Sequence, residues 1–346
     1  MKSRFSAAIV GVTGYTGSEL LRLLRLHSEV SLTMVTSESR KGEKLRDCYP
    51  HFHECPDIVV SSMDDVPGHD PDMVFLALPH GVSMKFMEKY GEKCRKIIDL
   101  SGDFRLGEKN LYEKWYKMKH ICPRFMDEAV YGMPEFFREE IKEARFVANP
   151  GCFPTSVIIP LVPLLKHGVI DESSIIADAK TGVSGAGAKP KKGTHFPDVF
   201  GNFSAYKLLF HRHTPEMETI LEQISGKTPS VLFTPHLLPV DRGILSTIYA
   251  DVSASVNKNE LKDIYEEAFC DEPFIRLSVT PPSLKNVRGS NYVDIYHEYD
   301  ERTGRIILLS AIDNLVKGAA GAAVQNMNIM LGCGETEGLT AFPLNP

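Results

Sequence analysis

The sequence lacks an apolar run long enough to cross a bilayer, because stretches such as residues 157–165 are interrupted by proline. It also lacks a strong excess of one charge, since 39 Lys and Arg against 45 Asp and Glu give a formal net charge of −6. Neither nucleic acid nor a membrane is therefore expected as a partner. We find no internal repeat and no low-complexity tract, and residues 1–4 lead into a strand-like segment without a secretory signal pattern.

The cysteine count is seven, an odd number, which argues against a complete disulfide framework and favours a reducing, cytoplasmic location. The 346 residues, 43% hydrophobic and 24% charged, are typical of an ordinary soluble globular protein. A chain of this length is expected to form two domains.

The first part of the chain alternates strand and helix patterns. Residues 5–12 and 30–35 read as strands on either side of a helix at 18–27. Further strands are expected at 73–78 and 96–100, with a helix at 82–90 between them. This alternation predicts an α/β fold with a Rossmann-type, doubly wound parallel sheet over residues 1–148.

The pattern changes after about residue 173, where longer strand-like runs follow with fewer helices between them. They are expected at 174–179, 231–234, 244–252, 291–296 and 305–312. This pattern of long strands with few helices predicts a second, α+β domain with a mixed sheet over residues 149–313. The small-residue helix at 315–330 could pack back on the first domain, so 314–346 is assigned to that domain.

A glycine loop joins the first strand to the first helix. Its spacing is GxxGxxG, formed by Gly11, Gly14 and Gly17. Glycines in this setting let the backbone turn sharply and approach a pyrophosphate, whose charge the helix amides favour. We therefore predict dinucleotide binding by this loop, including Thr13, Tyr15 and Thr16. The alternative is an ordinary turn.

The segment after the second strand bears on the choice of dinucleotide. It supplies Ser37, Ser39 and Arg40, where a site specific for NAD usually places an acid on the ribose. This composition favours NADP(H), although Glu38 lies in the same segment. The alternative is a solvated surface loop.

Cys152 lies on a tight turn, just before the apolar run that starts at residue 157. Amide groups at a helix start favour negative charge and stabilise a thiolate, the form of cysteine that attacks acyl carbons. Cys152 is therefore the candidate nucleophile. The competing interpretation is a small buried residue at a corner of the fold.

Two cysteines and two histidines, Cys48, His51, His53 and Cys55, fall within eight residues. Their spacing is too tight to surround one tetrahedral zinc ion, and Pro50 restricts the chain further. We predict no metal site.

Several long motifs resemble one family throughout the chain. The motifs are GVTGYTGSEL (11–20), DLSGDFRL (99–106), YGMPE (131–135), ANPGCFPTS (148–156), GVSGAGAKP (182–190), HRHTPE (211–216), PHLLPVDRGI (235–244), VRGSNYVD (287–294) and DNLVKGAAGAAVQNMN (313–328). Together they resemble the N-acetyl-γ-glutamyl-phosphate reductases of arginine biosynthesis, which are related to aspartate-semialdehyde dehydrogenase.

The resemblance implies an NADPH-dependent reduction of a small acyl phosphate to an aldehyde, through a thioester on Cys152. It also implies that residues 149–313 form a catalytic and oligomerisation domain, and that the protein is a homodimer or homotetramer. The first domain would bind NADP.

The same resemblance implies roles for residues outside the glycine loop. His211 and His213 would supply the acid or base, and alternation would place both imidazoles on one side of an extended segment, before a helix capped by Thr214. The sequence does not separate them, and His211 is the first choice. The anionic substrate would be bound by a set of basic and amide side chains, and the nicotinamide by a small-residue loop and an asparagine. The first set is Arg105, Asn149, Arg212 and Arg242, and the second is Ser184, Gly185 and Asn314. Each arginine could instead be a structural ion-pair partner.

Two alternatives remain open. A lysine-pathway acylphosphate reductase would use the same chemistry on a substrate that is one methylene longer or bound to a carrier protein. Lys189, Lys191 and Lys192 could form the basic rim that a carrier would need. The other alternative is a non-catalytic nucleotide-binding protein of the same fold.

Overall fold

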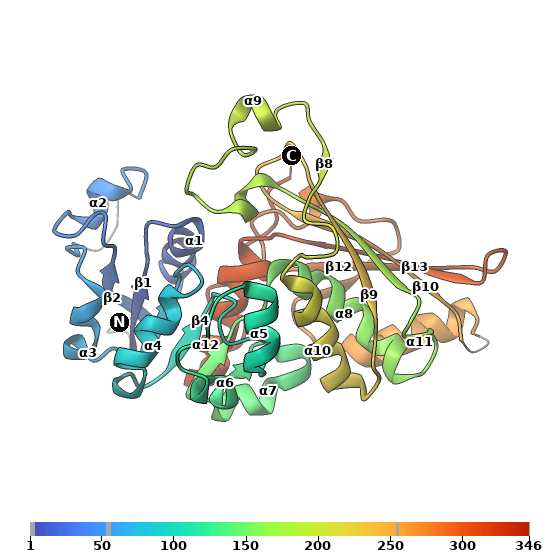
Figure 1. Ribbon diagram of the computed structural model, residues 1–346, viewed down its shortest axis with the longest axis horizontal. Helices are drawn as coiled ribbons and strands as arrows, with labels where there is room; N and C mark the ends of the chain where they lie inside the picture. The colour runs from blue at the N-terminus through green and yellow to red at the C-terminus, as the bar shows by residue number, and fades with distance from the viewer. Residues whose placement is uncertain (1–3, 53–56, 254–255, 346) are drawn as a thin grey trace. The chain divides into compact units, whose positions relative to one another are not determined.

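The computed structural model describes residues 4–52, 57–253 and 256–345. Its contacts divide the chain into two compact units, which the colours of Figure 1 help to trace. Unit 1 contains the residues up to Pro150 together with Ala319–Thr340. Unit 2 contains Gly151–Gly318 and the residues from Ala341 onwards. Whereas residues 314–346 were assigned to the first domain, both ends of that segment cluster with unit 2.

Unit 1 contains a six-stranded parallel sheet in the order β2-β1-β3-β4-β6-β5. The strands are β1 (Phe5–Val10), β2 (Val30–Thr36), β3 (Met73–Leu76), β4 (Ile97–Asp99), β5 (Val130–Tyr131) and β6 (Phe146–Ala148). Strands β2 and β3 lie on opposite sides of β1, so the strand order reverses at β1. Ligands of open α/β sheets bind at such a point, outside the carboxyl ends of the strands.

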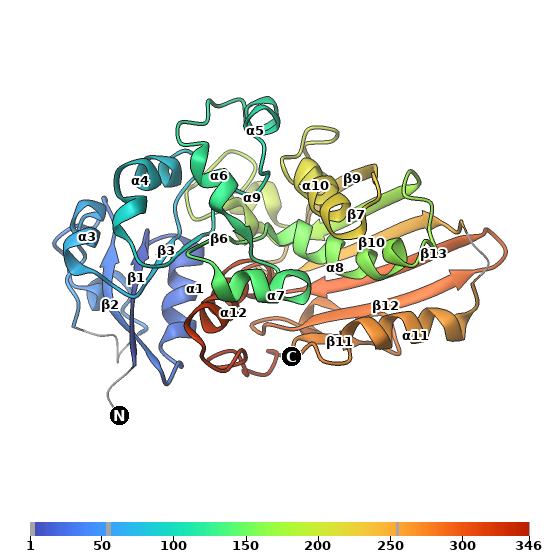
Figure 2. The same ribbon diagram turned by 90° about the horizontal axis from the view of Figure 1, so that it is seen from below.

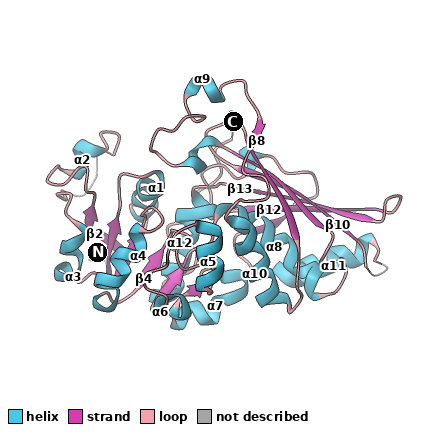
Figure 3. Cartoon of the chain, in the orientation of Figure 1, coloured by secondary structure: helices cyan, strands magenta, loops and turns pink. Residues whose placement is uncertain are grey.

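The helices of unit 1 are short, and Figure 3 draws the helices in cyan. They are α1 (Tyr15–Leu24), α2 (Leu45–Cys48), α3 (Val66–His69), α4 (Val82–Tyr90), α5 (Lys109–Tyr116), α6 (Arg124–Glu128), α7 (Pro134–Glu143) and α12 (Gly321–Leu331). Helix α12 packs against α1, α7 and β4, although it is more than two hundred residues from β4 in sequence. The core includes fully buried aromatic side chains such as Phe86, Phe125 and Phe146.

Unit 2 contains a seven-stranded mixed sheet in the order β11-β12-β13-β10-β7-β9-β8. The strands are β7 (Ile175–Thr181), β8 (Ser204–Ala205), β9 (Val231–Leu237), β10 (Ile244–Asp251), β11 (Ile275–Leu277), β12 (Val293–Asp300) and β13 (Arg305–Ile312). Burial alternates residue by residue along β7 and β10, so one face of the sheet is buried and the other is partly exposed.

The buried face is covered by helices, as Figure 2 shows for α8 beside β10 and β13. The helices of unit 2 are α8 (Cys152–Lys166), α9 (Phe196–Val199), α10 (His213–Ser225) and α11 (Lys258–Phe269). Every residue of α8 from Phe153 to Leu165 is buried, so this helix is the centre of the unit rather than a surface helix. Its first residue, Cys152, is therefore held by a rigid element.

These two sheets confirm the predicted fold class, a Rossmann-type sheet followed by an α+β unit with a mixed sheet. The sequence reading missed the short strands β5, β6, β8 and β11, which contain only two or three residues each. Within the described residues, no helix combines the length and the apolarity needed to span a membrane.

Candidate active site

The structure gives a different reason for glycine at each of the three positions of the first loop. Gly11 has φ of 95°, and a Cβ there would lie 2.5 Å from the carbonyl oxygen of Ala77. A Cβ on Gly17 would lie 2.4 Å from the carbonyl oxygen of Gly11, so the third glycine permits close packing of helix on strand. A Cβ on Gly14 would meet only the Gly11 oxygen, at 3.9 Å. The second glycine is therefore free of packing constraints and caps α1, where a phosphate would approach.

The segment after β2 lies beside this loop. The hydroxyls of Thr13 and Ser37 are 3.0 Å apart, and Ser37 in turn contacts the Ser39 hydroxyl at 3.2 Å. Arg40 is about half exposed and forms an ion pair with Glu43 at 2.9 Å. The structure thus brings the hydroxyl residues of the predicted cofactor site next to the glycine loop. Tyr15 and Thr16 form the first turn of α1, and Tyr15 is exposed.

Arg105 lies in a loop of unit 1 that is fixed by buried acids. The buried carboxylate of Asp103 accepts hydrogen bonds from the Gly81 amide and from the Tyr112 hydroxyl, both at 2.7 Å. Arg105 is largely buried and donates to the carbonyl oxygen of Leu100 at 2.9 Å. Its guanidinium is therefore oriented by its own loop.

Asn149, a predicted substrate residue, is fully buried in unit 1. Its side-chain amide donates to the carbonyl oxygen of Ala319 at 3.1 Å, and its side-chain oxygen accepts from Asn326 at 3.1 Å. Asn326 also donates to the carbonyl oxygen of Gly132 at 2.8 Å. This network joins the C-terminal segment to β6, and a role in substrate binding stays a prediction.

Cys152 is the first residue of α8, with Gly151 as the N-cap, and it is partly exposed. The Gly151 amide donates to the carboxylate of Glu216 at 2.7 Å, and Glu216 is fully buried. On its other side the cysteine packs against Gly318, where a Cβ would lie 2.7 Å from the Cβ of Cys152. The thiol is thus placed at the positive end of a rigid helix, the position predicted for a thiolate nucleophile.

Both predicted histidines lie close to the cysteine turn. The rings of His211 and His213 have centroids 4.8 Å apart. Phe153, the neighbour of Cys152, packs edge-on against His211 at 5.6 Å and against His213 at 5.9 Å. The structure therefore brings the candidate nucleophile and both candidate acid–base residues together within unit 2.

The local conformation differs from the expected extended segment. Helix α10 begins at His213 and its N-cap is Arg212, so Thr214 is the second helical residue rather than the cap. The amide of Thr214 already donates to the carbonyl oxygen of His211 at 3.0 Å, which closes the first turn. The two imidazoles are neighbours because the chain turns into a helix between them, and not because they alternate along a strand.

His211 is a neutral imidazole at neutral pH. Burial, followed by the charges of Lys207 and Arg212, lowers the pKa of His211 from 6.5 to about 3. The backbone amide of His213 donates to Nδ1 of His211 at 3.2 Å. A neutral ring that accepts at Nδ1 carries its proton on Nε2. His211 is therefore arranged as a hydrogen-bond donor.

A second loop cluster of unit 2 contains Ser184, Gly185 and Asn314. The side-chain amide of Asn314 donates to the Ser184 hydroxyl at 3.0 Å, and its oxygen accepts from the Gly243 amide at 2.7 Å. A Cβ on Gly185 would lie 3.9 Å from the Asn314 side-chain nitrogen. The structure thus brings together the three residues predicted to meet the nicotinamide.

Arg242 lies beside this cluster and forms an ion pair with the fully buried Asp313, at 3.1 Å. Asp313 also accepts from the backbone amides of Gly289 and Leu315, at 2.6 and 2.8 Å. This pairing is the structural alternative considered for the arginines, and substrate binding by Arg242 stays a prediction. The carbonyl oxygen of Asp313 accepts a hydrogen bond from the Gly318 amide at 2.9 Å, so the ion pair also fixes the segment that packs on Cys152.

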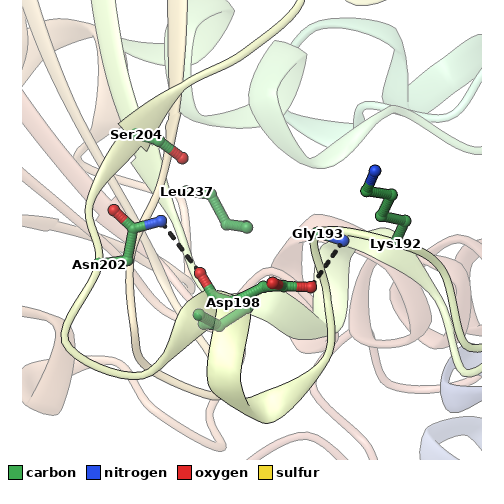
Figure 4. Close-up of a pocket in the computed structure, with 7 residues that line it drawn as sticks. Lys192, Gly193, Asp198, Asn202, Ser204 and Leu237 are labelled. Atoms are coloured by element: carbon green, nitrogen blue, oxygen red, sulfur yellow. Dashed lines mark hydrogen bonds between the residues drawn. The ribbon is translucent and has the colours of Figure 1, made fainter.

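A separate cavity of about 290 Å³ lies on the loop between β7 and α10. Figure 4 shows Asp198 between the side chain of Asn202, which donates to its backbone oxygen, and the amide of Gly193, which donates to its carboxylate. Lys192 also lines this cavity. None of the predicted catalytic residues lines this cavity.

Sequence reasoning missed two residues that position the site, Glu216 and Gly318. Glu216 ends the HRHTPE motif, and its position in the first turn of a helix was the only available signal. Gly318 lies in the small-residue run that was assigned as a packing segment. No group of three or more potential metal ligands occurs in the described part of the chain. His53 and Cys55, from the cluster weighed for zinc, lie outside the described residues.

Comparison with known proteins identifies the class to which this fold belongs. A family model described as "Semialdehyde dehydrogenase, NAD binding domain" matches residues 6–144, and one described as "Semialdehyde dehydrogenase, dimerisation domain" matches residues 152–314. Aspartate semialdehyde dehydrogenase II of Vibrio cholerae superposes with a TM-score of 0.74 at 19% identity, covering 96% of this chain and 99% of that chain. The enzyme of Candida albicans, solved with NADP, superposes with a TM-score of 0.73 at 18% identity, covering 94% and 98%. The fold is that of the semialdehyde dehydrogenase class.

Sequence relatives define the family more narrowly. The N-acetyl-gamma-glutamyl-phosphate reductases of Pelotomaculum thermopropionicum and Geobacter metallireducens are each 48% identical, covering 98% and 99% of this chain and 99% of each relative. The reductase of Bacillus cereus is 44% identical over 97% of this chain and 99% of the relative. The chain belongs to the N-acetyl-gamma-glutamyl-phosphate reductase family.

Proposed function

We propose that the protein reduces N-acetyl-γ-glutamyl phosphate to N-acetylglutamate 5-semialdehyde, with NADPH as reductant and release of phosphate, in the cytoplasm as a step of arginine biosynthesis. The observation that carries the proposal is Cys152 at the start of α8, with His211 and His213 packed around the neighbouring Phe153. A nucleophilic cysteine and imidazoles are the groups that acyl transfer to a thiol requires.

In this proposal the thiolate of Cys152 attacks the acyl carbon, and the carbon–oxygen bond to phosphate breaks. The acyl group is then held as a thioester on Cys152. The Nε2 proton of His211 would donate to the acyl oxygen as negative charge develops on it. A neutral imidazole suits this role, because it donates a hydrogen bond without first having to acquire a proton. His213, at the first position of α10, would exchange the proton of the thiol.

The cofactor would be held in unit 1 by the loop that contains Gly11, Gly14 and Gly17. Of these three, Gly14 has the open space that a pyrophosphate needs at the start of α1. When bound, NADPH supplies the hydride that reduces the acyl group to the aldehyde. Ser184, Gly185 and Asn314 would bind the nicotinamide amide, and release of the aldehyde restores the thiolate.

We infer a preference for NADP(H) over NAD(H) from Ser37, Ser39 and Arg40, which would contact the 2′-phosphate. Arg40→Gln is expected to raise KM for NADP⁺ by about tenfold and to leave KM for NAD⁺ unchanged. Arg25→Gln, at the C-terminal end of α1, is the matched control. An equal effect on both cofactors would contradict the preference.

The reaction is tested most directly in reverse, with N-acetylglutamate 5-semialdehyde, inorganic phosphate and NADP⁺, by following NADPH formation. We expect phosphate-dependent turnover that disappears in Cys152→Ala. A preference for the aldehyde that is one methylene longer would move the substrate to the lysine-pathway class. No turnover of either aldehyde by a folded, cofactor-binding protein would contradict the reaction and favour the non-catalytic alternative.

We also propose that the protein is a homodimer or homotetramer that associates through unit 2. The partly exposed face of the sheet formed by β7 and β10 supports this, because an alternating strand leaves one face available for a partner. Light scattering on the purified protein measures the mass directly, and a monomer at micromolar concentration would contradict association.

A further inference from the structure

Two loops of unit 1 follow neighbouring strands of the parallel sheet. Residues 77–81, which we call the β3 loop, follow β3, and residues 100–106, which we call the β4 loop, follow β4. Strands β1, β3 and β4 are parallel neighbours, so both loops leave the same edge of the sheet as the glycine loop after β1. Ligands of open α/β sheets bind at this edge.

The β3 loop packs directly against the glycine loop. The Ala77 amide donates to the carbonyl oxygen of Val10 at 2.9 Å, so pairing with β1 continues into the β3 loop. A Cβ on Gly11 would lie 2.5 Å from the carbonyl oxygen of Ala77 and 3.2 Å from Cδ2 of Leu78. Because the strand order reverses at β1, the β3 loop is placed to contact the same dinucleotide as the glycine loop.

Two hydrogen bonds in opposite directions join the β3 loop to the β4 loop. The Gly81 amide donates to Oδ2 of Asp103 at 2.7 Å, and the Gly102 amide donates to Nδ1 of His80 at 2.9 Å. A Cβ on Gly102 would overlap the Tyr116 hydroxyl and would lie 3.0 Å from Cε1 of His80, so this close approach requires glycine. The conformation of the β3 loop is therefore fixed by the β4 loop.

Asp103 also caps helix α4, which begins where the β3 loop ends. The N-cap of α4 is Gly81, which has φ of 80° and no side chain that could accept from the first helical amides. Oδ2 of Asp103 accepts from the Met84 amide at 3.3 Å, in addition to the bond from Gly81. A carboxylate from another loop thus replaces the local cap.

Asp103 is itself fully buried and held at several atoms. Its backbone amide donates to the Ser101 hydroxyl at 3.1 Å, and its carbonyl oxygen accepts from Nε2 of His120 at 2.9 Å. Its second carboxylate oxygen, Oδ1, accepts from the Tyr112 hydroxyl at 2.7 Å. Asp103 is therefore a rigid point of attachment for the β3 loop.

We propose that Asp103 is a positioning residue for the cofactor, which holds the β3 loop in the conformation that contacts the dinucleotide. This inference rests on the proposed function, because it assumes that unit 1 binds NADP(H). Asp103 is buried, so it acts through the Gly81 amide and the loop. A loop that is already ordered loses less conformational entropy when a ligand binds, and loss of the attachment therefore weakens binding.

Calorimetric titration of the full chain with NADP⁺ tests the proposal without turnover. We expect Asp103→Ala to weaken NADP⁺ binding by about tenfold or more, because the Gly81 and Met84 amides lose their acceptor. Asp103→Asn keeps an oxygen for these amides and can donate to the Tyr112 oxygen, so it should restore most of the affinity. Tyr112→Phe is the matched control, since it removes a hydrogen bond from the oxygen of the same carboxylate that does not contact the β3 loop. We expect this control to bind NADP⁺ with the affinity of the wild type.

Hydrogen exchange of residues 77–84, followed by mass spectrometry, is the second measurement. NADP⁺ is expected to slow exchange of these amides in the wild type, because the β3 loop would lie against the cofactor. Without cofactor, Asp103→Ala should exchange faster than the wild type in this segment, while β1 exchanges at the wild-type rate. A wild-type protein that binds NADP⁺ without slower exchange of 77–84 would overturn the proposal, even if Asp103→Ala does not fold.

Steady-state kinetics in the reverse direction separate positioning of the cofactor from a general loss of structure. We expect Asp103→Ala to raise KM for NADP⁺ by about tenfold and to leave KM for the aldehyde unchanged. Equal losses of NADP⁺ affinity in Asp103→Ala and Tyr112→Phe would show a general loosening of the β4 loop and would remove the positioning role. Wild-type affinity in Asp103→Ala would remove it as well.

The two proposals fail in different ways. A wild-type protein that binds NADP⁺ and shows these effects of Asp103→Ala, but does not turn over the aldehyde, would contradict the reaction and leave the role of Asp103 standing. Normal wild-type turnover with unchanged NADP⁺ affinity in Asp103→Ala would leave the reaction standing and remove that role. A wild-type protein without measurable affinity for NADP⁺ would overturn the assignment of Asp103.

Discussion

Gly318 packs directly on Cys152, so closely that a methyl group at position 318 would lie 2.7 Å from the Cβ of the cysteine. The methyl group would force the cysteine turn or the 313–318 segment to move. We expect Gly318→Ala to destabilise the protein by about 1–3 kcal/mol and to lower kcat by about a hundredfold or more. Denaturant unfolding and the reverse assay measure the two effects. Gly334→Ala is the control, because a Cβ there meets nothing within 4 Å, and equal effects of both substitutions would refute this account.

Glu216 is predicted to position the cysteine through the Gly151 amide. Glu216→Ala leaves that buried amide without its acceptor, which is expected to cost about 2 kcal/mol in the free energy of unfolding and to slow alkylation of Cys152. Glu216→Gln retains an acceptor oxygen and should recover most of the stability. If Glu216→Ala alkylates at the wild-type rate, Glu216 has a structural role only.

Alanine substitutions at the second and third glycines of the loop are expected to have different effects. Gly14→Ala is expected to fold normally, since its Cβ has room, and to lose cofactor affinity by about tenfold or more because the backbone can no longer approach the pyrophosphate. Gly17→Ala should instead destabilise the fold by about 1–3 kcal/mol, since its Cβ would lie 2.4 Å from the Gly11 oxygen. Cofactor titration and thermal unfolding distinguish the two. Normal cofactor affinity in Gly14→Ala would contradict the assignment of the loop.

His211 is expected to make unit 2 less stable in mild acid. Its pKa in the folded protein, about 3, lies below the ordinary value of 6.5, so the unfolded chain binds a proton first as the pH falls below 6.5. The stability that neutral His211 contributes is therefore lost progressively between pH 6.5 and 3, by about 2 kcal/mol at pH 5. Urea unfolding at about pH 7 and about pH 5 should show this loss in the wild type and not in His211→Gln. The same loss in both proteins would show that other groups are responsible.

Asp99 is expected to have the opposite effect in unit 1. Burial first, and then the charge of Asp103, raise its pKa from 3.8 to about 6. The folded state then holds the proton more tightly than the unfolded state. The stability contributed by protonated Asp99 is fully present below 3.8 and is lost as the pH rises through 6. Hydrogen exchange of β4 should show Asp99→Asn to be more stable than the wild type by about 2 kcal/mol at about pH 8, with little difference at about pH 4. No gain at the higher pH would contradict the raised pKa.

The sequence was sufficient for features that depend on neighbouring residues. The strand–loop–helix at the start of the chain, with Gly11 and Gly17, was predicted because glycine spacing and hydrophobic periodicity are local signals. The position of Cys152 at the start of a helix was predicted for the same reason, since the turn and the helix are adjacent in sequence.

The rest depends on contacts between distant segments. Glu216 is 64 positions from Cys152 and Gly318 is 166 positions away, and no local pattern indicates that either one touches the cysteine turn. The start of α10 was misplaced because a proline at the third helical position was taken for the first. The pKa of His211 depends on burial by segments as distant as β9, whose Phe233 ring lies 5.3 Å from it.

The way unit 1 is divided along the chain has a consequence for synthesis. Its sheet ends near Pro150, but α12, which packs on α1 and β4, is about 170 residues further on. The amide network of Asn149 and Asn326 cannot form until that helix has emerged from the ribosome. Most of unit 2 is continuous in sequence and is translated before α12. We therefore expect most of unit 2 to be available for folding before unit 1 is complete, and a nascent chain released before residue 321 would expose the surface of α1 that α12 covers.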